Sequence, residues 1–245
     1  MSADIVIPLG DGSPFDNEEL RFALRSVEKF VEDCGQVWIL SDCAPDWLQH
    51  VHVLPVPDPH RGNKDANIFD KLIFAAKMPE VSDIFIFLSD DQVFLAPFHA
   101  ETAKTVFNPR GWRAFAEGGI KWHRRMMATF TYLAERGIRL PYNFDAHVPM
   151  VYRKQDFQIL EGVDYVREPG FCINTLLCGL LKRRGELPQA VVKAHVESGD
   201  SAVNMFGKQF AGYNNAGFPV LRPYLQELFP EKSRYERAAS VNLQP

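Results

Sequence analysis

The stretch Ile84-Phe85-Ile86-Phe87-Leu88 is a continuous apolar run, and it ends directly in Ser89-Asp90-Asp91. A short run without polar alternation is typical of a strand that is buried on both faces of a parallel sheet. In open α/β sheets, ligands bind beyond the carboxyl ends of such strands. The sequence therefore predicts an α/β protein with Asp90 and Asp91 at the ligand-binding edge of its sheet.

Strand and helix patterns alternate ahead of this run. Leu20, Leu24 and Val27 fall on one face of a helix, and the preceding Asp16 or Asn17 can cap its first turn. The other expected elements are strands at 4–9, 37–40 and 51–56 and a helix at 66–77. This alternation is typical of βαβ units, so we expect a Rossmann-type, mostly parallel sheet flanked by helices.

The pattern after residue 100 is less regular and predicts a variable C-terminal half. Neither a repeat nor a linker divides the chain, so we expect residues 1–245 to form a single domain. The expected elements here are strands at 113–116 and 148–152, helices at 119–136 and 172–183, and a tail at 212–245 that wraps the core.

Composition excludes several classes of protein. With 46% hydrophobic and 24% charged residues, the chain is not disordered, collagen-like or a coiled coil. A net charge of -4 argues against electrostatic binding of the whole surface to nucleic acid or to an anionic membrane. The chain has no apolar run of membrane-spanning length and no basic N-terminal region, which predicts a cytoplasmic protein. Its four cysteines form no C-x-x-C pair, and we expect reduced, mostly buried thiols.

The Asp90-Asp91 pair is the first candidate site. Carboxylate oxygens are hard ligands that suit Mg²⁺ or Mn²⁺, and an ion held there can bridge the two phosphates of a nucleotide diphosphate. The alternative is that the two residues only end the strand, as Asp often does in turns. The pair alone favours neither interpretation.

The turn after the first strand is the second candidate. Asp11 and Gly12 would lie at the carboxyl end of that strand, where a glycine permits close approach of a nucleotide and Asp11 can accept a hydrogen bond from a base or ribose. The spacing matches neither a dinucleotide-binding motif nor a P-loop. Taken alone, the segment favours a simple turn over a binding site.

Three cationic residues on the predicted helices could bind phosphate. Arg21 and Arg25 are four residues apart and share a helix face, although a solvated face with Arg25 paired to Glu28 is the alternative. Lys71 follows Asn67 by four residues and could reach a phosphate at the same edge, or could be a surface lysine.

His147 is the best candidate for a general base, because a histidine pKa near 6.5 suits the deprotonation of a hydroxyl at neutral pH. A histidine between apolar residues is, however, often a core residue. The basic run 121–125 could face an acceptor, or could be a solvated helix face.

Five short segments, in order, resemble the conserved regions of the Stealth family of sugar-phosphate transferases. They are 11–30 with Asp11-Gly12-Ser13 and Asn17-Glu18-Glu19-Leu20-Arg21, Pro45-Asp46-Trp47-Leu48, Phe87-Leu88-Ser89-Asp90-Asp91, Ala146-His147-Val148-Pro149, and Phe229-Pro230-Glu231-Lys232-Ser233-Arg234-Tyr235-Glu236. Asn214 and Asn215 resemble the Asn-Asp element of the last region.

The resemblance implies a GT-A-like fold, with residues 1–100 as the nucleotide-sugar-binding half and 101–245 as the acceptor-binding and catalytic half. It implies a nucleotide diphosphate sugar as donor, with a UDP-sugar expected, and Mn²⁺ or Mg²⁺ on Asp90 and Asp91. His147 and Asp90 would be catalytic. The residues expected to bind the donor are Asp11, Gly12, Arg21, Arg25, Lys71 and Asn215.

The chain departs from the family pattern where the sugar phosphate would be handled. Ser89 replaces an Asn, Asn215 replaces an Asp, Lys71 stands where Glu is usual, and the Arg-Phe-Arg element is not evident at 167–171. We therefore expect a divergent, metal-dependent transferase that moves a sugar, or a sugar-1-phosphate, to an acceptor hydroxyl, with a glycan as the expected acceptor.

Three alternatives remain open: a sugar-1-phosphate transferase in the strict family sense, a non-catalytic protein that binds a nucleotide sugar or glycan, and a glycosyltransferase acting on modified bases of phage DNA. The net charge disfavours the DNA substrate. The apolar segment 218–229 either packs within the chain or forms a homodimer interface.

Overall fold

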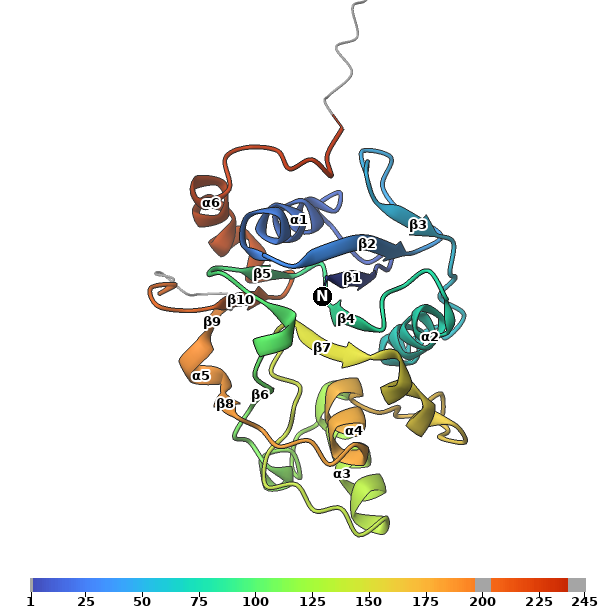
Figure 1. The fold of residues 1–245 in the computed structure, drawn as a ribbon. Helices are drawn as coiled ribbons and strands as arrows, with labels where there is room; N and C mark the ends of the chain where they lie inside the picture. The colour runs from blue at the N-terminus through green and yellow to red at the C-terminus, as the bar shows by residue number, and fades with distance from the viewer. Residues whose placement is uncertain (1, 197–203, 238–245) are drawn as a thin grey trace, which may run out of the picture.

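A computed structural model describes residues 2–196 and 204–237 of the chain. Its main sheet contains β1 (Ala3–Pro8), β2 (Cys34–Leu40), β3 (His52–Leu54), β4 (Ile84–Phe87) and β7 (Met150–Arg153). The strand order is β3-β2-β1-β4-β7; the first four strands are parallel, and β7 runs antiparallel to β4 (Figure 1). The predicted α/β sheet, mostly parallel and flanked by helices, is confirmed.

Two helices make the crossovers of this sheet. α1 (Glu18–Phe30) leads from β1 to β2, whereas α2 (Lys64–Lys77) leads from β3 back across the sheet to β4. The two connections run in opposite directions, and because such crossovers are right-handed, the helices lie on opposite faces (Figure 1). The predicted side-chain cap of α1 is wrong: Asn17 has a left-handed backbone and makes no cap bond, and the Ser13 hydroxyl accepts the backbone N–H groups of Phe15 and Asn17 instead.

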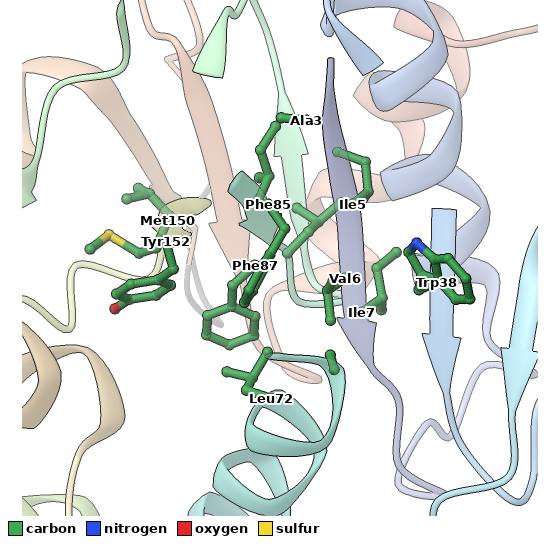
Figure 2. Close-up of a cluster of buried hydrophobic side chains, with 14 of the residues drawn as sticks. Ala3, Ile5, Val6, Ile7, Trp38, Leu72, Phe85, Phe87, Met150 and Tyr152 are labelled. Atoms are coloured by element: carbon green, nitrogen blue, oxygen red, sulfur yellow. The ribbon is translucent and has the colours of Figure 1, made fainter. Parts of the chain in front are cut away.

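The core lies on both faces of the central strands, against α1 on one face and α2 on the other. Phe85 and Phe87 of β4 are buried beside β1 and β7, and Leu72 of α2 packs under them (Figure 2). The absence of polar alternation in 84–88 is therefore explained, since β4 has a strand on each side and apolar contacts on each face.

The second half adds smaller elements. They are β5 (Gln92–Phe94), β6 (Val106–Phe107), β8 (Leu187–Pro188), β9 (Lys193–Val196), β10 (Phe210–Tyr213), α3 (Lys121–Glu135), α4 (Ile173–Leu180), α5 (Gln189–Val192), α6 (Phe218–Leu228) and the 3₁₀ turns η1 (Ala100–Thr102), η2 (Trp112–Ala114) and η3 (Lys154–Leu160). The predicted strand at 113–116 is wrong, because η2 occupies part of it. The small sheet β5-β10-β9 was not predicted, and it places β10 next to the chain that follows β4.

The C-terminal segment packs back onto the first half, as expected of the described part of the tail. Residues 229–237 follow α6 and reach α1 and the loop before β3, where the backbone of Arg237 bonds to Trp47 (N–H to O, 2.8 Å). The apolar segment 218–229 packs within the chain, with Leu221 and Leu225 of α6 fully buried. Residues 238–245 lie outside the described part.

The cysteines match the expectation in part. All four are free thiols; Cys172 and Cys178 are buried, whereas Cys34 is partly buried and Cys43 is exposed. Among the described residues, no helix combines the length and apolar composition needed to cross a membrane.

Candidate active site

A cleft of about 820 Å³ opens at the carboxyl edge of the main sheet. The chain leaves β1 toward β2 on one side, and it enters β4 from β3 on the other side. The point between β1 and β4 is therefore a topological switch point, which is where open α/β sheets bind ligands. The cleft is lined by Gly10–Ser13 after β1, Asp90 and Asp91 after β4, and Lys64, Asn67, Ile68 and Lys71 on α2.

Asp90 and Asp91 lie side by side on the wall of this cleft and have different electrostatic surroundings. Burial and the neighbouring Asp91 carboxylate raise the pKa of Asp90 to about 6, against a smaller opposite effect of Lys64. Burial also opposes the charge on Asp91, but His147 holds the pKa of that carboxyl below its usual range. Asp91 is therefore the more readily ionised of the two.

His147 is held against Asp91. Its Nε2 lies 2.9 Å from Asp91 Oδ1, and the two side chains are 35% and 27% exposed. The backbone of His147 is left-handed, with a φ of 54°, which is costly for a residue with a side chain. Gly212 of β10 packs directly against it: a Cβ there would be 2.8 Å from the His147 carbonyl oxygen and 3.2 Å from Nδ1. His147 itself does not line the cleft, but its partner Asp91 does.

Several cations line the same cleft as these carboxylates. Arg61, Lys64 and Lys121 line it, and none of the three forms an ion pair with another described residue. Arg125 also lines the cleft but is bonded to Asp65 and to the carbonyl oxygen of Pro169. Three side chains with free positive charge in one cleft provide a site for an anion such as phosphate.

The residues expected to bind a donor divide into two groups. Asp11, Gly12 and Asn215 are exposed and line the cleft together with Lys71. Lys71 is not a surface lysine, since only 2% of it is exposed; its Nζ donates to the Leu9 carbonyl oxygen at 2.7 Å and pairs with Asp58 Oδ1 at 2.6 Å.

Arg21 and Arg25 lie apart from the cleft. Both bind Glu236, which is buried, with Arg25 Nε 2.7 Å and Arg21 Nη1 3.0 Å from its carboxylate oxygens. Glu28, the alternative partner of Arg25, contacts Arg234 instead. The structure thus places both arginines in an internal ion-pair cluster.

The structure also brings polar residues to the cleft that the sequence reasoning missed. Glu19 is 4% exposed, lines the cleft and accepts the Ser13 hydroxyl at 2.8 Å, and His60 lines it from the loop before α2. Tyr213 does not line the cleft, but its hydroxyl is buried behind it without a hydrogen-bond partner among the described residues. Burial and the carboxylates of Asp91 and Asp90 raise the pKa of this hydroxyl. The sequence signal for Glu19 is its place in the first turn of α1. No local pattern marks His60 or Tyr213.

The Asp90-Asp91 pair fits a divalent cation that shares its coordination with a substrate. Within 2–196 and 204–237, no group of three or more His, Cys, Asp or Glu side chains is placed to hold a metal ion. Mg²⁺ is commonly bound through one or two carboxylates together with substrate phosphates, which is the donor set that this cleft can offer. A divalent cation would also offset the repulsion between Asp90 and Asp91 that contributes to the raised pKa of Asp90.

The sequence matches no protein-family model, and no curated protein matches it.

Proposed function

We propose that the protein is a metal-dependent transferase that uses a nucleotide diphosphate sugar and moves the sugar to an acceptor hydroxyl, with a UDP-sugar and a glycan as the expected substrates. The observation that carries the proposal is the pair of carboxylates at the switch point. Asp91 binds His147, while Lys64 and Lys121 line the same cleft and pair with no other residue in 2–196 and 204–237. Carboxylates, a histidine and free cations are the groups needed for a metal, a base and a diphosphate.

The segments that resemble the Stealth family support this proposal by their positions. Asp91 and His147, from the second and third resembling regions, meet at the cleft. Arg21, Trp47 and Glu236, from the other regions, meet at the ion-pair cluster, where the Arg21 guanidinium lies 3.9 Å from the centre of the Trp47 ring. Short motifs that are far apart in sequence thus assemble into two sites, one of them at the cleft. A GT-A-like fold is part of the same proposal.

Each residue has a distinct task in the proposed reaction. Asp90 and Asp91 would hold Mn²⁺ or Mg²⁺, which neutralises charge on the leaving diphosphate when it is bound. Lys64 and Lys121 bind phosphate oxygens, while Asp11, Gly12 and Asn215 contact the donor along the same wall.

His147 is the proposed base. Its Nε2 faces Asp91, and Nδ1, on the side of Gly212, is the nitrogen that would take the proton of an acceptor hydroxyl reaching that side. The acceptor oxygen then bonds to the anomeric carbon, the bond from that carbon to the phosphate oxygen breaks, and a nucleoside diphosphate leaves. In a strict sugar-1-phosphate transfer, the acceptor oxygen would bond to the β-phosphorus, and a nucleoside monophosphate would leave.

The test is to incubate the protein with Mn²⁺ or Mg²⁺, a panel of nucleotide sugars and hydroxyl acceptors, and to identify the nucleotide released. We expect a nucleoside diphosphate, with release abolished by a chelator. Asp91→Asn and His147→Gln should each reduce turnover about 100-fold or more.

His99→Gln is the matched control, because His99 is also paired with an aspartate, Asp33, at 3.3 Å but does not line the cleft. It should keep wild-type turnover. Release of a nucleoside monophosphate would show that the protein transfers a sugar phosphate and not the sugar alone. Binding of a donor without any product would favour the non-catalytic protein, and no binding of any donor would contradict the proposal.

A further inference from the structure

His60 is fixed in the cleft wall by two residues of other elements. Its Nε2 lies 2.8 Å from Asp70 Oδ2, and the Tyr165 hydroxyl donates to the other oxygen, Asp70 Oδ1, at 2.7 Å. Burial and the hydrogen bond to Asp70 raise the pKa of Tyr165, so its hydroxyl keeps its proton and is the donor. An ionised Asp70 only accepts hydrogen bonds, so His60 Nε2 carries a hydrogen.

The backbone of His60 is fixed as well. Its N–H donates to Asn67 Oδ1 at 2.9 Å, and its carbonyl oxygen accepts the N–H of Asn63 at 3.0 Å. The second ring nitrogen, Nδ1, has no hydrogen-bond partner among the described residues, and it is not one of the buried polar atoms without a partner. His60 lines the cleft, so Nδ1 is left available to a ligand there.

The His60 side chain extends from the loop before α2 toward the middle of that helix, because its ring partner Asp70 lies beyond Lys64. Lys64, next to Asp90 and Asp91, begins the helix, and Asp70 follows six residues later, which is about 9 Å along the helix axis. Asp58 is two residues before His60 and lies near Gly10, where an added Cβ would be 3.5 Å from Asp58 Oδ2. His60 therefore belongs to the end of the cleft near β1.

The charges at that end suit an uncharged group. Lys71 is paired with Asp58, His60 is hydrogen-bonded to Asp70, and Asp42 adds an exposed carboxylate to the wall. Arg61, the residue after His60, also lines the cleft and forms no ion pair with another described residue, so carboxylates outnumber free cations at this end. Carboxylates repel phosphate, but they accept hydrogen bonds from ribose hydroxyls and from the N–H groups of a base. Lys64 and Lys121, which have no ion-pair partner in the described part of the chain, mark where the diphosphate would lie.

We propose that His60, positioned by Asp70 and Tyr165, binds the nucleoside of the donor through Nδ1. The proposal rests on the proposed function, and it adds the residue that recognises the nucleoside separately from the diphosphate. His60 is a binding residue in this proposal, and Tyr165 is a positioning residue that acts through Asp70.

The test compares a nucleotide with the same diphosphate lacking its nucleoside. The dissociation constants of UDP, ADP, GDP and CDP are measured with Mn²⁺, and the tightest of the four is then compared with inorganic pyrophosphate. We expect His60→Ala to weaken nucleotide binding about tenfold, because the variant loses one hydrogen bond to the ligand and the contacts of the ring. Pyrophosphate binding should stay within about twofold of wild type.

Two further variants make the result specific. Lys64→Gln should weaken both ligands, because its charge faces the diphosphate end. Tyr165→Phe keeps the aromatic ring, whose centroid lies 4.8 Å from that of Phe69, but removes the hydrogen bond to Asp70 Oδ1. It should therefore weaken nucleotide binding about threefold and leave pyrophosphate binding unchanged. Intact pyrophosphate binding also shows that each variant is folded.

The outcomes separate the two proposals. If His60→Ala leaves nucleotide binding unchanged, or weakens pyrophosphate equally, the assignment of His60 is overturned while the proposed function stands. If the wild type binds none of the four nucleoside diphosphates, the proposed function is overturned and the assignment of His60 with it.

Discussion

Asp145 shows how a single carboxyl near the site controls stability. Its carboxylate accepts the Thr175 backbone N–H at 3.0 Å and also the Thr175 hydroxyl, and burial raises its pKa to about 6 despite these bonds. In the unfolded chain an Asp has a pKa of about 3.9. Between these two values the folded state binds the proton that the unfolded state has lost, so the contribution of Asp145 to stability decreases as the pH rises.

The change that tests this is Asp145→Asn, which removes the titration. Relative to this variant, the wild type should lose about 2–3 kcal/mol of unfolding free energy as the pH rises from about 4 to about 7, as linkage predicts from the pKa difference. The measurement is urea unfolding of both proteins at several pH values across this range. Parallel curves for the two proteins would contradict the assigned pKa.

At the scale of elements, β10 determines where His147 can lie. Gly212 is paired in the small sheet, and an added Cβ there would meet the His147 carbonyl oxygen at 2.8 Å, which is closer than real Cβ contacts allow. Gly212→Ala should therefore displace His147 from Asp91. We expect a loss of about 1–3 kcal/mol in stability from overpacking, and a fall in turnover of at least tenfold.

The matched control for this change is Gly119→Ala, because an added Cβ at Gly119 meets nothing within 4 Å. It should change neither turnover nor stability by a measurable amount. Turnover and thermal unfolding of the two variants are measured side by side. Wild-type turnover in Gly212→Ala would mean that the contact of β10 does not position the base.

The elements of the first half could be predicted because their signals are local. The apolar run of β4 and the helical periodicity of α1 are each contained within about a dozen residues, and the structure confirms both. The strands β5, β9 and β10 have only three or four residues each and, unlike β4, do not lie in a continuous apolar run of five residues, so they are not recognisable before their partners are known. The same limit applies to the wrong prediction at 113–116, because four residues are too few to distinguish a strand from the 3₁₀ turn η2 that the chain forms.

For the molecule as a whole, the sequence could indicate which residues share an edge or a face, but not which distant residues meet. Asp90, Asp91, Asp11 and Gly12 were placed at one sheet edge by the rule for strand ends, and they do line one cleft. Arg21 and Arg25 share a helix face as predicted, but their partner Glu236 is more than 200 residues away, and no local pattern identifies it. His60 was missed for the same reason, since Tyr165 comes from another part of the chain.

The contact between Glu236 and α1 joins the two ends of the described chain. Burial opposes the charge of Glu236, but hydrogen bonds from Arg25, Ser233 and Arg21 hold the pKa of its carboxyl below the usual range. Because Glu236 is only 3% exposed and pairs with two arginines, removing its charge leaves both guanidinium groups without their partner. A broken pair of this kind costs more than a surface pair.

Glu236→Gln should therefore lower the free energy of unfolding by about 2–4 kcal/mol. The matched control is Glu227→Gln, at an exposed residue of α6, and it should change the free energy of unfolding by less than about 0.5 kcal/mol. Both are measured by urea denaturation near pH 7, where the wild-type carboxylate is ionised. Since the pKa of Glu236 is depressed in the folded state, its contribution is present above the unfolded pKa of about 4.3 and is lost as the pH falls below it. The difference between wild type and Glu236→Gln should accordingly shrink on acidification. A difference that is absent at neutral pH would mean that the arginines find other partners, and that the C-terminal segment is held by its backbone bonds and apolar contacts alone.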